Sequence, residues 1–145
     1  MKRLVFHITL PLTIIAAVML GSCKNGSKEV TYSKVEVTED VAEIVFDTLS
    51  HDYGDVLPDT TTSFDFVFHN IGATPLYLES VVPGCGCTKT LWPKGSIDPG
   101  EAGVITAIYD SHGREPGHFA KSIRVFSNAK TSFVRLSISG GIVDN

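Results

Sequence analysis

The sequence of 145 residues lacks an excess of positive charge. Its 12 Lys and Arg side chains are outnumbered by 16 Asp and Glu, and charged residues of both signs make up only 19% of the chain. Proteins that bind nucleic acid through its phosphates carry a basic surface, so nucleic acid is excluded as the expected partner. Hydrophobic residues reach 43%, which excludes a disordered chain. Length and composition together predict one small globular domain.

Familiar catalytic motifs are also missing. The sequence contains no G-x-S-x-G nucleophile elbow, no phosphate-binding P-loop and no H-E-x-x-H zinc motif. Gly84-Cys85-Gly86 could begin a dinucleotide-binding fingerprint, but Lys89 stands where the third glycine is required and no helical pattern follows. No pair of carboxylates has a spacing that indicates general acid and base catalysis. We therefore expect no enzymatic activity, no cofactor and no small-molecule substrate.

The N-terminus carries a targeting signal. Met1-Lys2-Arg3 is basic, and residues 4–20 form an uncharged, mostly apolar run. The run is short for a transmembrane helix, and Pro11 would weaken such a helix in its middle. It ends in Leu20-Gly21-Ser22-Cys23, which resembles the lipobox of bacterial lipoproteins, where the cysteine is lipidated and becomes the new N-terminus. The alternative is an ordinary cleaved signal followed by an unrelated cysteine.

A lipidated Cys23 would anchor the chain to a membrane through acyl chains such as palmitate, without a transmembrane helix. Residues 1–22 would be the signal peptide, and the mature chain would be more acidic because Lys2 and Arg3 are removed with it. Lys24 stands where many inner-membrane lipoproteins carry aspartate, and no acidic cluster that would favour export to the cell surface follows. We expect an anchor in the outer membrane, facing the periplasm, with the cell surface as the less favoured alternative.

The pattern of the remaining chain is that of an all-β domain. Residues 23–41 are polar without a sustained period, which predicts a flexible tether. Residues 42–145 contain short β-rich runs separated by Gly, Pro, Asn and Asp, which predicts a single immunoglobulin-like sandwich of seven to eight strands. No helical period is sustained, so helices should be absent or minimal. The expected strands are residues 42–47, 52–57, 62–69, 76–82, 103–110, 119–127 and 132–142, with an eighth at 87–92 if that run pairs.

Two of these runs show which residues should form the core. In the third run every second residue is a phenylalanine, and in the last run every second residue is aliphatic. Since alternate residues of a strand point to the same face, we expect a buried face in each run, formed by Phe64, Phe66 and Phe68 and by Val134, Leu136 and Ile138.

Cys85-Gly86-Cys87 is the one unusual group of reactive side chains. On a strand the two thiols would be presented on the same face, and Gly86 would let the backbone bend. Three interpretations stay open: a structural bridge or turn in an oxidising compartment, a strained redox-active disulfide, and a site for Cu(I) or Zn(II). A metal would add imidazoles from His112 and His118, or from His51 or His69, although solvated surface positions are the default for these histidines.

Several short motifs follow one another between residues 44 and 143. They are Tyr53-Gly54-Asp55-Val56, Phe64 to Asn70 with Gly72, Thr74-Pro75-Leu76, Cys85-Gly86-Cys87-Thr88, Ile97-Asp98-Pro99-Gly100-Glu101-Ala102-Gly103, Tyr109-Asp110 and Val125-Phe126-Ser127-Asn128. Their order resembles a bacterial family, the domain-of-unknown-function family 1573 (DUF1573). The resemblance implies an immunoglobulin-like sandwich similar to Hydin-type domains, in secreted or lipid-anchored proteins, and it implies no reaction.

These features predict a lipid-anchored periplasmic protein that acts as a non-catalytic binding or scaffold module of the cell envelope. We expect the partner to be an envelope protein, bound by addition of a strand at a sheet edge or by the loops at one end of the sandwich. The alternative from a different class is a thiol redox protein, or a copper- or zinc-handling protein, that uses Cys85 and Cys87.

Overall fold

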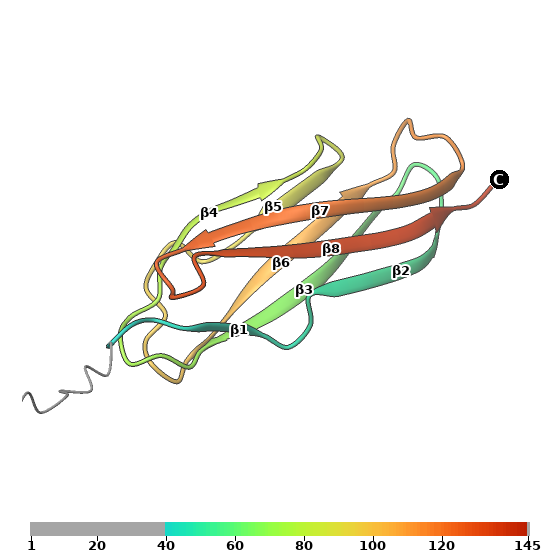
Figure 1. Cartoon of the computed structure of the whole chain (residues 1–145). Helices are drawn as coiled ribbons and strands as arrows, with labels where there is room; N and C mark the ends of the chain where they lie inside the picture. The colour runs from blue at the N-terminus through green and yellow to red at the C-terminus, as the bar shows by residue number, and fades with distance from the viewer. Residues whose placement is uncertain (1–39, 145) are drawn as a thin grey trace, which may run out of the picture. The chain divides into compact units, whose positions relative to one another are not determined.

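A computed structural model of the protein describes residues 40–144 (Figure 1). The predictions for the signal peptide, for Cys23 and for nearly all of the tether lie outside these residues. No helix occurs in the described range, and accordingly no apolar helix of membrane-spanning length is found there. The strands are β1 (Ile44–Phe46), β2 (Ser50–Val56), β3 (Thr61–Asn70), β4 (Leu78–Pro83), β5 (Thr88–Leu91), β6 (Ala102–Asp110), β7 (Gly117–Ser127) and β8 (Phe133–Ile142).

The strands form two four-stranded sheets. Sheet A has the order β1-β3-β6-β5, and sheet B has the order β2-β8-β7-β4. All neighbouring strands are antiparallel except β2 and β8, which are parallel. Figure 1 shows β7 and β8 of sheet B passing in front of β6 and β3 of sheet A. The predicted all-β sandwich is confirmed, and the run expected at residues 87–92 pairs with β6 as the eighth strand.

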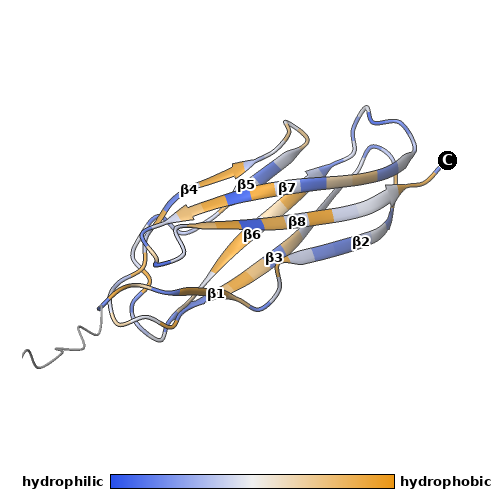
Figure 2. Ribbon diagram, viewed as in Figure 1, coloured by the Kyte–Doolittle hydropathy of each residue, from blue (hydrophilic) through white to orange (hydrophobic). Residues whose placement is uncertain are grey.

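The core lies between the sheets and follows the alternation of the sequence. Phe66 and Phe68 are completely buried, as are Leu136 and Ile138 from the opposite sheet. Figure 2 shows hydrophobic positions on the strands of both sheets. Phe64, the third ring expected in the core, is only half-buried and packs against its border. Burial of such side chains supplies most of the stabilisation of a small sandwich.

Gly103 of β6 lies opposite Phe68 of β3 and leaves room for its ring. A Cβ atom at position 103 would be 2.3 Å from the Phe68 Cζ atom. Because the Phe68 side chain is completely buried, its ring has no free space into which to move. The glycine is therefore required by close packing between the two central strands of sheet A.

We expect Gly103→Ala to lower the free energy of unfolding by about 1–3 kcal/mol, because the added methyl group overpacks a filled core. Gly95→Ala is the matched control, since no atom lies within 4 Å of a Cβ at that position, and its effect should stay within about 0.5 kcal/mol. Urea unfolding of both variants measures the difference. Equal stability of the two variants would contradict the packing described here.

Candidate functional site

Cys85 and Cys87 lie in the connection that takes the chain from β4 of sheet B to β5 of sheet A. They form a disulfide, with Sγ atoms 2.07 Å apart and Cα atoms 5.3 Å apart. Cys87 is buried and Cys85 is half-buried against the core. The Thr88 hydroxyl lies 3.4 Å from the Cys85 Sγ atom, and the Asp110 N–H donates to the Cys87 carbonyl over 2.9 Å. The two sulfur atoms are bonded to each other, so neither is a free thiolate ligand.

The four residues considered as a metal site are not brought together. The His112 Nδ1 atom lies 2.6 Å from the Asp110 Oδ1 atom, and His118 is exposed near the start of β7. Among residues 40–144 no three His, Cys, Asp or Glu side chains are arranged to hold a metal ion. The set of Cys85, Cys87, His112 and His118 therefore does not form a metal-binding geometry, because the sulfur atoms share a bond and His112 pairs with a carboxylate.

His51 departs from the expected solvated position. Its ring stacks on Phe64 with a centroid distance of 3.7 Å and meets Tyr53 edge-on at 4.8 Å. The Tyr53 hydroxyl donates to the Ala107 carbonyl over 3.0 Å, and burial raises the pKa of Tyr53 to about 12. These rings join β2 of sheet B to β3 and β6 of sheet A. They close one side of the sandwich, and His51 thus packs against aromatic rings.

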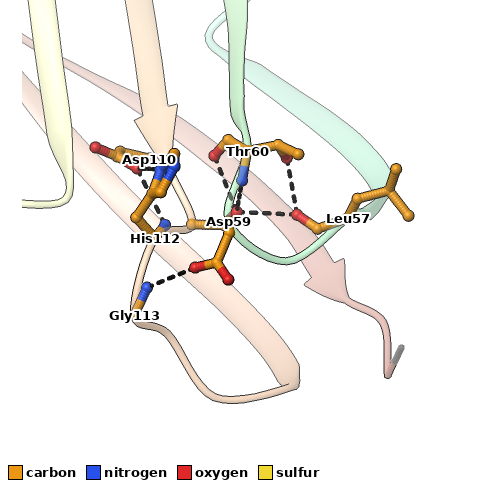
Figure 3. Close-up of polar contacts among 7 residues, drawn as sticks. Leu57, Asp59, Thr60, Asp110, His112 and Gly113 are labelled. Atoms are coloured by element: carbon orange, nitrogen blue, oxygen red, sulfur yellow. Dashed lines mark hydrogen bonds and ion pairs between the residues drawn. The ribbon is translucent and has the colours of Figure 1, made fainter.

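Hydrogen bonds join the loop between β2 and β3 to the loop between β6 and β7 (Figure 3). The buried Ser111 hydroxyl accepts from the Thr60 N–H over 2.9 Å and lies 2.9 Å from the Leu57 and Thr60 carbonyl oxygens. Asp59, which has a positive φ of 52°, accepts from the Gly113 N–H over 3.1 Å. Carboxylates that accept backbone N–H bonds in this way hold loops in place.

Asp110 and His112 belong to the same loop pair. The His112 backbone N–H and then its ring donate to the Asp110 carboxylate, and these bonds hold the pKa of Asp110 below its usual range. Both side chains are exposed or nearly so. The contact between Asp110 and His112 therefore lies at the surface and supports the loop, and the lowered pKa keeps the Asp110 carboxyl ionised at neutral pH.

Asn70, at the end of β3, is completely buried. Its Nδ2 group donates to the Thr74 carbonyl over 2.8 Å and to the Ile97 carbonyl over 2.9 Å. Its Oδ1 atom accepts from the N–H groups of Gly72 over 3.0 Å and Glu43 over 3.4 Å. Every hydrogen-bonding position of the side chain is thus used, as a buried amide requires. The sequence motif that ends at Asn70 indicated no role for its side chain, because its partners lie up to 27 residues away.

The backbone of Asn70 joins the same end of the sandwich to the turn before β6. Its N–H donates to the Glu101 carbonyl over 3.0 Å, and its carbonyl accepts from the Gly100 N–H over 2.8 Å. Gly72 fits close to the chain before β1, where a Cβ atom would be 2.3 Å from the Val41 carbonyl oxygen. The sequence motifs around Asn70, Gly72 and Gly100 therefore have a structural reason.

Asn128 ties another motif to the same end of the fold. Its Oδ1 atom accepts from the Tyr77 N–H over 2.7 Å, and its Nδ2 group donates to the Pro75 carbonyl over 3.0 Å. The side chain thus fixes the segment before β4 to the turn between β7 and β8. Asn128 therefore also has a structural role.

The part of the chain that the structure describes contains no pocket. Many small-molecule sites are concave, whereas protein-binding surfaces can be flat. The outer face of sheet A carries exposed aliphatic side chains.

An apolar strip, formed by Val45, Val67, Val104 and Leu91, crosses this face from β1 to β5. Val67 lies directly opposite Val104, while Val45 and Leu91 each lie diagonally next to one of these two residues on the same face. Val45 is 43% exposed, Val104 40% and Leu91 62%. Diagonal neighbours on one face of a sheet are close enough for their side chains to touch, so the strip is continuous.

Polar side chains border the apolar strip. The His69 Nε2 atom lies 3.0 Å from the Asp47 Oδ1 atom, and the Thr106 hydroxyl donates to Asp65 over 2.7 Å. An apolar centre with a polar border is typical of a surface that binds another protein.

The sheet edges are less suited to binding a partner strand. β1 and β5, at the edges of sheet A, have three and four residues. β2 is irregular between Asp52 and Asp55, and β4 is irregular between Leu78 and Ser80 and ends at Pro83. Short, bulged or proline-containing edges oppose strand addition. Strand addition at an edge, one of the two binding modes expected from the sequence beside contacts of the end loops, is therefore disfavoured by these edges.

A family model described as "Protein of unknown function (DUF1573)" matches residues 44–142. None of the curated proteins matches this sequence. The matched range begins at the first residue of β1 and ends at the last residue of β8. The family match and the sandwich therefore cover the same part of the chain.

Several solved structures have a similar fold. A protein of unknown function from Porphyromonas gingivalis W83 has a TM-score of 0.62 at 18% identity, over 76% of this chain and 51% of that one. A PapD-like domain of human CEP192 has a TM-score of 0.59 at 13% identity, over 77% of this chain and 93% of that one. The VesB protease of Vibrio cholerae has a TM-score of 0.53 at 13% identity, over 70% of this chain but 32% of the protease. The chain spans about half the length of the Porphyromonas protein. At these identities the similarities show the immunoglobulin-like fold alone.

We expect Asn70→Asp to lower the free energy of unfolding by about 3 kcal/mol or more. The substitution keeps the shape of the side chain, but it replaces the Nδ2 donor with an oxygen that faces the Thr74 and Ile97 carbonyls, leaving buried acceptors unpaired. Asn128→Asp is the control, because that residue is exposed and its Oδ1 atom can still accept from Tyr77. The control should lose about 1 kcal/mol. If denaturant unfolding shows that both variants lose the same free energy of unfolding, the buried hydrogen bonds of Asn70 do not have the importance described here.

Proposed function

The chain belongs to the DUF1573 family of proteins of unknown function, and from its surface we propose that it is a non-catalytic protein-binding module of the cell envelope. The observation that carries this proposal is the apolar strip on the outer face of sheet A. The aliphatic side chains of the strip leave apolar surface area exposed to water. Contact with a partner would bury that area, which is favourable.

The size of this face fits a small contact. With strands about 4.8 Å apart and a rise of about 3.3 Å per residue, the outer face of sheet A is roughly 15–20 Å wide, and it is about 30 Å long only along β3 and β6, since β1 and β5 have three and four residues. Its area of at most roughly 450–600 Å² is below the roughly 800 Å² that each partner contributes to a standard interface and is typical of a weaker, transient contact. The partner would be an envelope protein that presents apolar side chains, and the acidic balance of the chain argues against nucleic acid.

The proposed anchor is the lipidated Cys23, which would place the module at the periplasmic face of the outer membrane, with the cell surface less favoured. A flexible tether of about 20 residues has a typical end-to-end distance of about 25 Å. The module would therefore reach partners close to the bilayer without embedding in it. Copper or zinc handling gains no support from the described residues, because Cys85 and Cys87 are bonded to each other and no third ligand accompanies them. The thiol redox alternative gains none either, because a disulfide is equally expected of a structural bridge.

We expect Cys23→Ala to move the protein from the membrane fraction to the soluble fraction, because the acyl anchor can no longer be attached. Detergent phase separation of cells that produce each version measures the change. Ser22→Ala is a suitable control, since a small residue is kept before the cysteine and anchoring should persist. A Cys23→Ala protein that still partitions into the detergent phase would contradict the anchor.

We expect a photo-cross-linking amino acid placed at Val104 to give a protein adduct in living cells. The same amino acid at Glu115, in the exposed loop between β6 and β7, is the control and should give none. Adding Leu91→Glu should abolish the adduct at position 104, because a carboxylate in the apolar strip would be desolvated by a partner. Absence of an adduct at position 104, or the same adducts at both positions, would contradict the proposal.

A further inference from the structure

The outer face of sheet B carries two arginines directly opposite each other. Arg124 of β7 pairs in register with Arg135 of β8, and both side chains are exposed. Like charges at directly opposite positions of antiparallel strands destabilise the pairing. Neither arginine has a carboxylate partner, since the ion pairs found within residues 40–144 are those of His69 with Asp47 and of His112 with Asp110. No ion pair within the described residues therefore offsets the repulsion between the two arginines.

The pair does not belong to a generally basic surface. The chain has 12 basic and 16 acidic side chains, and the outward neighbours of the two arginines on β7 and β8 are uncharged. On one side lie Phe126 and Phe133, paired in register with ring centroids 5.3 Å apart. On the other side Ser122 lies opposite Ser137. Figure 2 shows β7 and β8 side by side, each with hydrophilic positions along its length.

Successive cross-strand pairs on this face thus offer aromatic rings, then two guanidinium groups, then two hydroxyl groups. Alternate residues of a strand are about 6.6 Å apart, which is also the spacing of alternate side chains in an extended peptide. A guanidinium group pairs with a carboxylate through two parallel hydrogen bonds. An apolar residue followed two positions later by a carboxylate would match the spacing between the ring pair and the arginine pair.

We propose that this face, formed by Phe126, Phe133, Arg124, Arg135, Ser122 and Ser137, binds an extended acidic segment of a partner protein. One carboxylate of the segment lies at the level of the two arginines and pairs with both of them, and an apolar side chain two positions away contacts the rings. The inference rests on the proposed function, because it names the chemistry of a protein partner, but it uses the sheet opposite the apolar strip. Complementary charge is the reason for the choice of an acidic partner.

An anionic bilayer fits this face less well than a peptide. Asp52 and Asp55 lie exposed on β2, at the edge of the same sheet, with Asp52 opposite Ser139 and Asp55 opposite Gly141. A bilayer surface would cover these carboxylates together with the arginines and would be repelled by them. On β8 the residues opposite these carboxylates, Ser139 and Gly141, lie four and six residues beyond Arg135, about 13 and 20 Å along the strand, so a short segment centred on the ring and arginine pairs lies away from them.

The test uses the full chain in detergent and a fluorescein-labelled synthetic peptide that repeats Phe-Ser-Glu-Ser, so that Phe and Glu alternate along one face of the extended peptide, with an otherwise equal peptide that has Lys in place of Glu for comparison. Fluorescence anisotropy measures binding. We expect the acidic peptide to bind, the basic peptide not to bind, and the double variant Arg124→Gln/Arg135→Gln to bind the acidic peptide about 100-fold more weakly, about tenfold for each charge-assisted pair lost. The double variant should have an equal or higher melting temperature, because the repulsion between the arginines is removed.

The matched control is Lys89→Gln/Lys130→Gln, which removes two positive charges elsewhere and should bind like the unchanged chain. Equal losses in the two double variants would overturn the proposal, as would failure of the unchanged chain to bind the acidic peptide. Stronger binding to phosphatidylglycerol vesicles than to the peptide, lost in the arginine variant, would overturn it in favour of a membrane. If the unchanged chain fails to bind the acidic peptide but still gives an adduct at Val104, this inference alone is rejected, whereas peptide binding without an adduct at Val104 would reject only the proposed role of sheet A.

Discussion

The amide of Asn70 is the contact on which one end of the sandwich depends. This side chain is completely buried, and it joins four backbone groups that belong to different segments of the chain. Each of those groups would otherwise be a polar atom removed from water without a partner, which is costly. A single buried residue thus determines how the segments before β1, after β3 and before β6 meet.

Close packing extends this constraint along sheet A. Gly103 follows the turn that Asn70 holds, and it is the glycine that makes room for Phe68. The buried amide and the aromatic core therefore act on the same pair of strands, β3 and β6. Because these requirements fall on the interior and on the turns, the outward positions of both sheets are free to carry other chemistry. This is the physical reason for seeking function on the sheet faces.

Much of the fold could be predicted from local patterns. The alternation of Phe66 and Phe68 predicted a buried face, and the run that became β5 was recognised as a conditional strand. The expected start of β4 at residue 76 was two residues early, because Leu76 forms only an isolated bridge with Ile97. These features depend on neighbours in the sequence, and the period of a strand is a local property.

The remaining features depend on register between distant strands, which no local pattern contains. His51 was expected at the surface, but it stacks on Phe64 because β2 and β3 lie in opposite sheets. The apolar strip and the arginine pair exist only because Val67 meets Val104 and Arg124 meets Arg135. The role of Asn70 was equally hidden. An asparagine after a strand predicts a turn, whereas its partners at Glu43 and Ile97 become visible only in the folded chain.

The central claim is that the motif residues of this chain act by holding the fold, and native-state hydrogen exchange of the full chain tests it most directly. The amides of Gly72 and Gly100, which donate to the side chain and to the backbone of Asn70, should exchange only through global unfolding. Their opening free energies should then equal those of the central strands β3 and β6. Exchange of these two amides at the rate of an exposed loop amide such as that of Gly95 would contradict the account, because it would show that the Asn70 contacts open while the sandwich stays folded.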